Sequence, residues 1–304
     1  MKILQSLLIT SCLLGLFATS AVAQDRKIDP NVIEQTNVAE LNRIASESEE
    51  TFKREFAIAE AAAIKNDWAV VQELDDGRVI RLQRLDQDGN PVYYVTENAI
   101  SAGVINTDAV HAMPFGLTGL GINIGEWDGG NIRSTHEQYS GRVTNNEGSS
   151  TNSHSTHVCG TLIGDGTGNA SAKGMAPAAT VDGYNSSNDV AEMASEASSG
   201  MLVSNPSYGL FAGWGSFGGC NFWYGNTALS TAESHIFGLY GSVSRSMDVV
   251  AANAPFYLIV RSAGNDRNDV SPGLVHAHNS TSCGTTFNDA HGNDGQNGGF
   301  DCIQ

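Results

Sequence analysis

The sequence predicts an α/β fold in which a parallel sheet carries helices on both faces. From about residue 118 onward, apolar strand segments alternate with helix segments, an order typical of parallel strands joined by crossover helices. Two of the apolar segments end at a polar residue next to glycine, at Asp128 and at Asn265. Sites in such sheets are built at the carboxyl ends of the strands, so both residues are candidates for function.

The composition fits a globular enzyme rich in turns. The 304 residues are 40% hydrophobic and include 34 glycines, and this length is enough for one large domain and a smaller one. The formal net charge is −17. Nucleic acid is therefore not an expected partner, because phosphate binding needs a basic surface.

The N-terminus has the pattern of a secretory signal peptide. Lys2 precedes a mainly apolar run over 3–22, and Ala21-Val22-Ala23 offers a cleavage site after its last residue. We therefore expect residues 1–23 to be removed from a secreted or periplasmic protein. A lipoprotein signal lipidated at Cys12 ranks second, because the apolar run continues past that cysteine. No other stretch is long and apolar enough to span a bilayer.

Residues 24–113 predict a small α+β module ahead of the sheet. A segment rich in Ala, Glu and Arg predicts a helix over 37–65. Short strands are predicted at 69–74, 78–85 and 92–96, with turns rich in Asp and Gly between them. Residues 114–304 then form the larger domain.

In the larger domain, patterning predicts strands over 121–128, 179–184, 202–204 and 256–265, and helices beginning near 153 and covering 189–198 and 242–254. The last strand begins with an apolar run typical of a buried strand. The segment 210–241 is long and aromatic, which predicts a loop. Such a loop either lies over a cleft and contacts a ligand or packs on its own aromatic side chains.

The segment 152–161 carries two histidines three residues apart, so a helix beginning there places His154 and His157 on one side of its first turn. Small neighbours let a substrate approach, and histidine is the usual general base near neutral pH. An alternative groups His136 with these two residues as zinc ligands. It ranks low, because no H-E-x-x-H motif accompanies them and the segments around Asp128 and Asn265 would have no explanation.

Together these segments resemble the subtilisin-like serine peptidases, or subtilases. That family has an Asp after an apolar strand, then H-G-T-H-V-x-G-T, then A-G-N, in the chain order Asp, His, Ser. The matching segments here are Asp128, His154 through Thr161, and Ala263-Gly264-Asn265, with G-x-A-P at 174–177 and S-x-G at 207–209 in support. Ser155 stands where the family usually has glycine, and its small side chain is expected to fit the helix start.

The resemblance implies a role for each matched residue. His154 would be the general base, Asp128 the carboxylate that orients it, and Asn265 the side-chain donor of the oxyanion hole. The substrate backbone would run between two segments. These are Ser207, Tyr208 and Gly209 on one side and Ser262, Ala263 and Gly264 on the other.

The resemblance also implies partners. Peptides or proteins would be the substrates. Residues 24–113 occupy the place of a propeptide, which would act as an intramolecular inhibitor cut off between 98 and 115; a plain accessory domain is the alternative. The chemistry requires no cofactor. Whether calcium binds is left undecided. Asp and Asn residues, whose oxygens can bind calcium, cluster after position 265, but they lack the spacing of an EF-hand.

The family's nucleophile segment, G-T-S-x-A-x-P, has no counterpart in this sequence; the nearest string is Cys283-Gly284-Thr285-Thr286. We therefore expect a subtilisin-like fold that is incomplete at its C-terminus, as in the front part of a secreted subtilase precursor, and a chain that is inactive or insoluble by itself. The alternative is a non-catalytic secreted peptide-binding protein, or a decayed gene product, that keeps part of the fold.

Beyond the leader, the cysteines are Cys159, Cys220, Cys283 and Cys302. In an exported protein an even number suggests disulfides, and four cysteines allow three full pairings. Cys283 with Cys302 is one plausible pair. Cys159 lies within the histidine helix and is expected to be a small buried residue.

Overall fold

A computed structural model describes residues 29–73, 79–96, 107–231, 234–265, 275–278 and 287–288. The signal peptide, the alternative lipid site at Cys12, the propeptide cut and the pair Cys283–Cys302 fall wholly or partly outside these residues. None of the described helices is long and apolar enough to cross a membrane.

The centre of the fold is a five-stranded sheet in which every pair of neighbours is parallel. The strand order is β11 (Leu258–Ile259), β7 (Val203–Pro206), β4 (Asn123–Asp128), β6 (Thr180–Asn185), β5 (Val143–Asn145). β4 lies in the middle, and five of its six residues are buried. Its carboxyl end, which carries Asp128, is therefore enclosed by a strand on each side.

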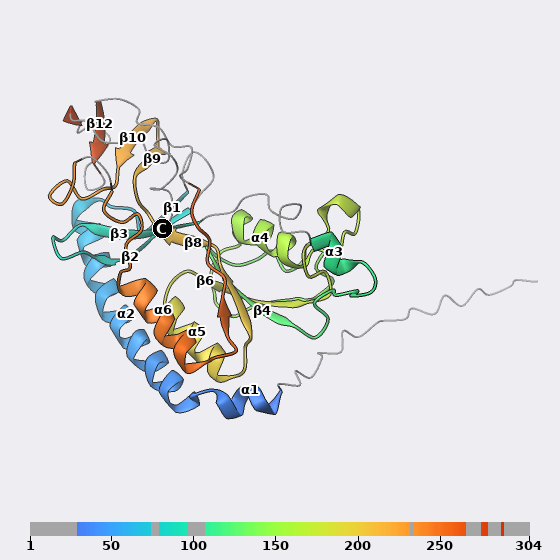
Figure 1. The fold of residues 1–304 in the computed structure, drawn as a ribbon. Coiled ribbons are helices and arrows are strands. Elements are labelled where there is room, and N and C mark those ends of the chain that lie inside the picture. The colour runs from blue at the N-terminus through green and yellow to red at the C-terminus, as the bar shows by residue number, and fades with distance from the viewer. Residues whose placement is uncertain are drawn as a thin grey trace, which may run out of the picture.

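Helices cover both faces of this sheet, as the alternating pattern predicts (Figure 1). On one face α4 (Ser153–Ile163) packs its buried Cys159 and Ile163 against the sheet. On the other face lie α5 (Asp189–Ser198) and α6 (Ser242–Asn253), whose apolar sides share a core with Trp127. The predicted α/β class is confirmed.

The N-terminal part begins with α1 (Pro30–Gln35) and the long helix α2 (Val38–Asn66). The Asn37 side chain accepts a hydrogen bond from the Glu40 N–H and so caps α2. An antiparallel meander follows, made of β1 (Val71–Glu73), β2 (Val79–Leu85) and β3 (Pro91–Thr96). A short helix, α3 (Thr107–His111), precedes the central sheet. Helix and meander match the predicted elements to within two residues.

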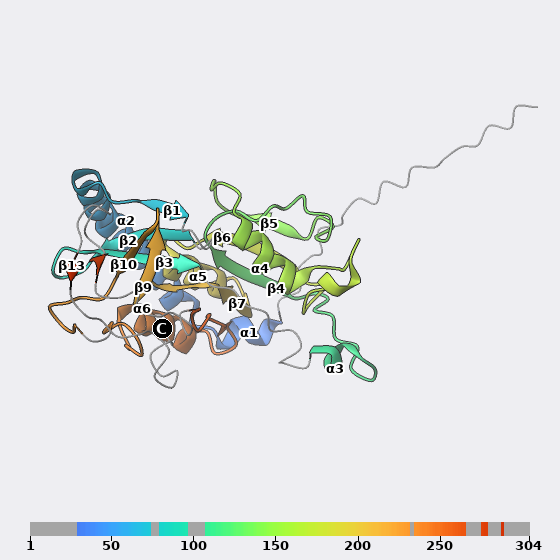
Figure 2. The same cartoon turned by 90° about the horizontal axis from the view of Figure 1, so that it is seen from above.

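This N-terminal part shares both its sheet and its core with the larger domain. β3 pairs antiparallel with β8 (Tyr208–Leu210), so the meander continues into a strand more than a hundred residues later. Leu41 and Ile44 of α2 are buried in one cluster with Trp127 and Met247. Seen from above, β1, β2 and β3 gather beside α2 on one side of the molecule, and α4 and β5 lie on the other (Figure 2).

Two expectations for the second half of the chain are wrong. The strand predicted over 256–265 is only the two-residue β11, and it is not buried: Leu258 is 61% exposed, because β11 lies at an edge of the described sheet. The segment 210–241 is not a plain loop. It forms the hairpin of β9 (Trp214–Phe217) and β10 (Cys220–Trp223). This hairpin belongs to a four-stranded sheet that also contains β12 (Val275–His278) and β13 (Phe287–Asn288), in the order β13, β12, β10, β9.

The aromatic side chains of this hairpin region pack on one another. Phe211 meets Tyr224 edge to face at 4.0 Å between ring centroids, and Trp214 meets Trp223 at 5.0 Å. Of the two alternatives for these aromatics, the structure favours self-packing. Cys220 is in a disulfide, whereas Cys159 is buried and in no disulfide, as expected for that position.

Candidate active site

Asp128 lies at the carboxyl end of the central strand and is fully buried. The two glycines that follow let the chain turn away sharply. A Cβ atom at Gly130 would lie 2.7 Å from the Ser150 carbonyl oxygen, so no larger residue fits there without displacing backbone. The Gly129 N–H donates to the Asp128 carboxylate, which fixes the side chain in place. The strand end thus presents a carboxylate held in one orientation.

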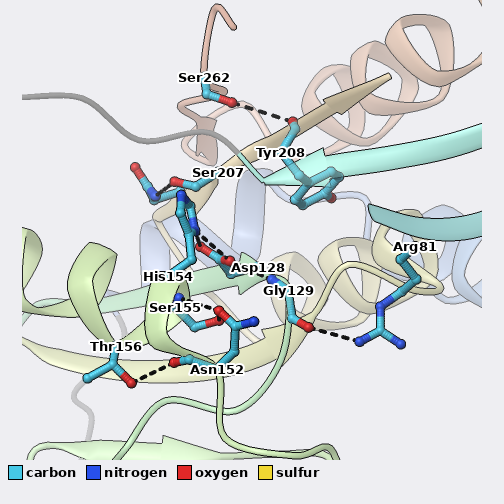
Figure 3. A network of polar contacts seen from close by, with 11 residues as sticks. Arg81, Asp128, Gly129, Asn152, His154, Ser155, Thr156, Ser207, Tyr208 and Ser262 are labelled. Atoms are coloured by element: carbon cyan, nitrogen blue, oxygen red, sulfur yellow. Dashed lines mark hydrogen bonds and ion pairs between the residues drawn. The ribbon is translucent and has the colours of Figure 1, made fainter. Parts of the chain in front are cut away.

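His154 is brought to this carboxylate by the start of α4. The Asn152 side chain accepts a hydrogen bond from the Ser155 N–H at 3.0 Å and caps the helix, which leaves His154 in its first turn. Nδ1 of His154 lies 2.8 Å and 2.9 Å from the two carboxylate oxygens of Asp128 (Figure 3). Since a carboxylate only accepts, Nδ1 carries a proton, and in the neutral imidazole Nε2 then has a free lone pair.

Nε2 of His154 has no hydrogen-bond partner among the described residues, although the atom is buried. The side chain as a whole is 13% exposed, at the edge of the site. In the neutral imidazole, a buried nitrogen without a partner can accept a proton from a group that comes within reach. His157, by contrast, points to solvent and takes no part in this pair. The structure therefore separates the two histidines of the motif into one site residue and one surface residue.

The predicted substrate segment begins directly beside Asp128. The Ser207 N–H donates to the Trp127 carbonyl oxygen at 3.0 Å, which continues the pairing of β7 with β4. The Asn205 side chain donates to the Ser207 hydroxyl at 2.6 Å. Asn205 was not predicted as a site residue; its position two residues before Ser207, on the same side of an extended strand, was the available signal.

The two predicted walls of the substrate cleft meet. The Ser262 N–H donates to the Pro206 carbonyl oxygen at 3.2 Å, and the Ser262 hydroxyl donates to the Tyr208 carbonyl oxygen at 3.4 Å (Figure 3). On the other edge of β8, Val95 and Thr96 of β3 pair with Gly209 and Tyr208. The gap predicted between the two segments is thus closed by the contacts of Ser262, and the opposite edge of β8 is occupied by the N-terminal part of the same chain.

Asn265 is half-buried at the end of the segment that follows β11. The structure records no hydrogen bond from its side chain to another described residue, Asp128 and His154 included. Gly264 before it has a φ of 95°, a left-handed conformation that favours glycine. Ala263 is exposed beside it. The oxyanion role of Asn265 stays a prediction.

The structure adds a residue that the sequence analysis missed. Glu126, two residues before Asp128 on the same face of β4, is 1% exposed. Neither carboxyl oxygen has a nitrogen or oxygen partner among the described residues, and the Cys159 thiol is its polar neighbour. Burial, assisted by the Asp128 charge, raises the pKa of Glu126 well above its usual range. A glutamate inside an apolar strand was the signal in the sequence.

Arg81 of β2 is a second missed residue. Its guanidinium donates from Nη2 to the Gly129 carbonyl oxygen at 2.9 Å (Figure 3). Glu147 is its acidic neighbour and in turn accepts hydrogen bonds from the backbone and side chain of Asn185, at the end of β6. The N-terminal meander therefore reaches the residue next to Asp128.

The zinc alternative is not supported by the described residues, which contain no cluster of three or more His, Cys, Asp or Glu side chains suited to a metal ion. His136 packs on the ring of Tyr139 at 5.0 Å instead. The Asp- and Asn-rich segment considered for calcium falls almost entirely outside the described residues.

Comparison with known proteins gives one family. The model of the subtilase family matches residues 87–290, about two thirds of the chain. Among solved structures, the crystal structure of a cold adapted subtilisin-like serine proteinase is 19% identical over 50% of this chain and 50% of its own, with a TM-score of 0.30. The chain thus spans about half the length of that solved structure. No curated protein matches it.

Proposed function

The chain belongs to the subtilase family, and from this premise we propose that it is a secreted serine endopeptidase that uses Asp128 and His154 with a serine on a G-T-S-x-A-x-P segment. The observation that carries the proposal is the Asp128–His154 pair, with Nε2 of His154 buried and without a partner in the described part of the chain. The 304 residues contain no G-T-S-x-A-x-P segment. They are therefore expected to position a substrate but not to hydrolyse it.

The chemistry follows from the roles of the groups. Nε2 of His154 takes the proton of the serine hydroxyl as its oxygen attacks the peptide carbonyl carbon. Asp128 keeps the Nδ1–H tautomer and stabilises the imidazolium. The side-chain amide of Asn265 donates to the oxyanion of the tetrahedral intermediate. His154 then protonates the leaving amine, and water, deprotonated by the same histidine, hydrolyses the acyl-enzyme.

The substrate backbone would lie along Ser207, Tyr208 and Gly209 by replacing β3, which occupies one edge of β8 in this structure, with Ser262, Ala263 and Gly264 on the opposite side of these residues. Backbone hydrogen bonds of an added strand give affinity for any extended peptide, and side-chain contacts give preference. β3 has this antiparallel position on β8. This supports the proposal that residues 24–113 are a pro-segment that inhibits the peptidase by occupying its substrate edge.

The signal-peptide pattern of residues 1–23 supports export to the periplasm or the medium. Cys220 in a disulfide is consistent with an oxidising compartment. Residues 1–23 would be cleaved after Ala23.

Two measurements test the proposed function. The reading frame downstream of the Gln304 codon is expected to contain a G-T-S-x-A-x-P segment. The protein that includes this segment is expected to hydrolyse casein, and the His154→Ala variant to lose at least about 10³-fold in kcat/KM. The 304-residue chain is expected to show no turnover. Equal activity of the longer protein and its His154→Ala variant would overturn the mechanism.

A non-catalytic secreted peptide-binding protein is the second candidate, and its motivation is that the 304 residues contain no G-T-S-x-A-x-P segment. Sequencing the reading frame downstream of the Gln304 codon also distinguishes the two candidate functions. A stop codon directly after Gln304 would favour the binding function. In that case the 304-residue chain should bind extended peptides at β8 and release them uncut.

A further inference from the structure

The buried side chains of β4 divide between the two faces of the central sheet, as neighbours on a strand do. Trp127 lies in the core shared with α5 and α6, and a Cβ atom at Gly125 would collide with its ring. Ile124 lies in the opposite core, together with buried side chains of α4. Glu126 and Asp128 follow Ile124 at steps of two residues. Both carboxyl groups therefore lie on the α4 face of the sheet.

In the described chain, the strands on either side of Glu126 supply no donor to its carboxyl group. Its register partners are Gly183 of β6 and Asn205 of β7. Gly183 has no side chain, and the Asn205 amide donates to the Ser207 hydroxyl at 2.6 Å. Glu126 is 1% exposed, and neither of its oxygens has a hydrogen-bond partner among the described residues. Burial of an ion costs far more than burial of a neutral acid, so the folded chain favours the protonated form of Glu126.

Helix α4 and the segment before β5 bring further titratable groups to this face. Together with Glu126, the titratable groups on this side are Asp128, His154, Cys159 and Tyr139. Burial raises the pKa of the Cys159 thiol and of the Tyr139 hydroxyl, so both stay neutral at moderately alkaline pH. Arg142, a neighbour of Cys159, donates to two backbone carbonyl oxygens at 2.9 Å and 2.8 Å. Among the described residues, Glu126 and His154 are therefore the groups on this face that can change charge at and above neutral pH.

Glu126 lies one step along the strand from the Asp128–His154 pair. Successive side chains on one face of a strand are about 7 Å apart. Nδ1 of His154 lies 2.8 Å from the Asp128 carboxylate (Figure 3). A second negative charge at Glu126 would act through the protein interior, where salt and water screen it weakly. It would stabilise the imidazolium form of His154, which makes the neutral ring a stronger base.

We propose that Glu126 is a positioning residue that adjusts the strength of the His154 base: it is a neutral acid at neutral pH, and in alkaline solution it ionises and favours protonation of His154. The step is the loss of one proton from the Glu126 carboxyl group to solvent. Burial, with the charge of Asp128 as the second cause, raises the pKa of Glu126 well above its usual range, in agreement with this behaviour. The inference rests on the proposed function, in which His154 is the general base, but its first test needs no turnover.

NMR of the full 304-residue chain tests the inference. Carbon-13 labelling of glutamate follows the carboxyl carbon of Glu126, and nitrogen-15 labelling of histidine follows the ring of His154, from pH 6 to pH 10. The Glu126 carboxyl group, assigned by its loss in Glu126→Gln, is expected to be protonated at pH 7 and to ionise on the alkaline side. The ring signals of His154 should show a step with the same midpoint, and this step should be absent in Glu126→Gln.

Glu192→Gln is the matched control. Glu192 is another acid beside β4 whose pKa burial raises, to about 9, but it accepts from the Trp127 indole N–H on the opposite face of the sheet. Its removal should leave the alkaline step of His154 in place. Glu126→Asp, which keeps a carboxyl group, should retain the step at a changed midpoint. A step that disappears in Glu192→Gln and persists in Glu126→Gln would overturn the inference. A Glu126 carboxyl group already ionised at pH 7, or still protonated at pH 10, would overturn it as well.

Activity measures the consequence for the proposed function. In the longer protein with a G-T-S-x-A-x-P segment, the ratio of kcat/KM between the unaltered form and Glu126→Gln should rise about threefold from pH 7 to a pH above the midpoint of the Glu126 step. A constant ratio, with the NMR step intact, would overturn the role of Glu126 in positioning the base. Absence of casein turnover by both forms, with the NMR step intact, would count against the peptidase function and leave the charge coupling of Glu126 and His154 standing.

Discussion

The guanidinium of Arg81 donates a hydrogen bond to the carbonyl oxygen of Gly129, the residue that follows Asp128. The two residues are 48 positions apart and belong to the N-terminal meander and the central sheet. This contact ties the geometry of the Asp128 turn to the presence of the meander. The N-terminal part therefore supports the site from one side, while its strand β3 covers the edge of β8 that we propose for the substrate.

Replacement of Arg81 by Met is expected to lower the free energy of unfolding by about 1–2 kcal/mol, because the Gly129 carbonyl oxygen loses a charged donor in a half-buried place. Urea denaturation measures the change. Arg84→Met is the matched control on the same strand. Among the residues that the structure describes, its guanidinium donates only to the neighbouring Leu85 carbonyl oxygen at 3.4 Å, so this substitution should cost less than half as much. An equal loss of unfolding free energy in the two variants would show that the hydrogen bond to the Gly129 carbonyl oxygen does not contribute to stability.

Asp128→Asn is expected to change the tautomer of His154. In the unaltered chain the carboxylate accepts from Nδ1–H, whereas an asparagine amide can donate to Nδ1 and move the ring proton to Nε2. Nitrogen-15 NMR of the imidazole side chains distinguishes the two forms. The exposed His157 serves as an internal reference that should not change. An Nδ1–H tautomer of His154 in both proteins would contradict the proposed role of Asp128.

Glu126→Met is expected to stabilise the fold by about 1–3 kcal/mol, because it removes a buried carboxyl group whose oxygens have no nitrogen or oxygen partner in the described chain. Methionine keeps the length of the side chain next to Cys159. Glu137→Met, at an exposed position, is the control and should change stability by less than about 0.5 kcal/mol. A loss of stability in Glu126→Met would mean that the carboxyl group has a hydrogen-bonding role.

Glu192 gives a pH prediction. Burial, with the charge of Glu147 as the second cause, raises the pKa of Glu192 to about 9, even though the Trp127 indole N–H donates to it at 2.8 Å. Between its ordinary pKa of about 4.5 and the raised value, the folded state holds a proton that the unfolded state has lost, so this group makes stability fall as pH rises. The Glu192→Gln variant should therefore lack this decrease in stability with rising pH.

The measurement compares urea midpoints of the two proteins at pH 5 and pH 8. Relative to the unaltered chain, Glu192→Gln should gain about 1–2 kcal/mol more at pH 8 than at pH 5, a figure reduced for the partial exposure of the side chain. Glu137→Gln at the surface should show no such gain. A gain of the same size at both pH values would mean that Glu192 is ionised in the folded chain.

Local patterns were sufficient for most elements of the fold and for the central pair of the site. The helix predicted over 189–198 is α5 to the residue, and Asn37 and Asn152 cap helices where a polar residue precedes a helical pattern. The pairing of Asp128 with His154 follows from one strand end and one helix start that meet at the same edge of a parallel sheet.

The remainder depended on contacts between distant segments or on turn chemistry that was overlooked. No pattern within β3 indicates that it pairs with β8, and the partners of Arg81 and Glu126 exist only in the folded chain. The hairpin of β9 and β10 had a readable signal: Gly218 and Gly219 have φ angles of 57° and 75° and form the two-residue turn that such a pair favours. The exposure of β11 follows from its place at a sheet edge, which periodicity does not reveal.

The order of strands in the central sheet has a consequence for how the chain acquires its structure. β4 pairs with β6 and β7, which lie more than fifty residues further along, whereas α2 and the meander find each other within a span of about sixty residues. Long loops cost more entropy to close, so contacts of high sequence separation form late. We expect the N-terminal part to fold first, while the sheet is still emerging from the ribosome. α2 and the open edge of β3 then act as a template against which α5 and β8 find their places.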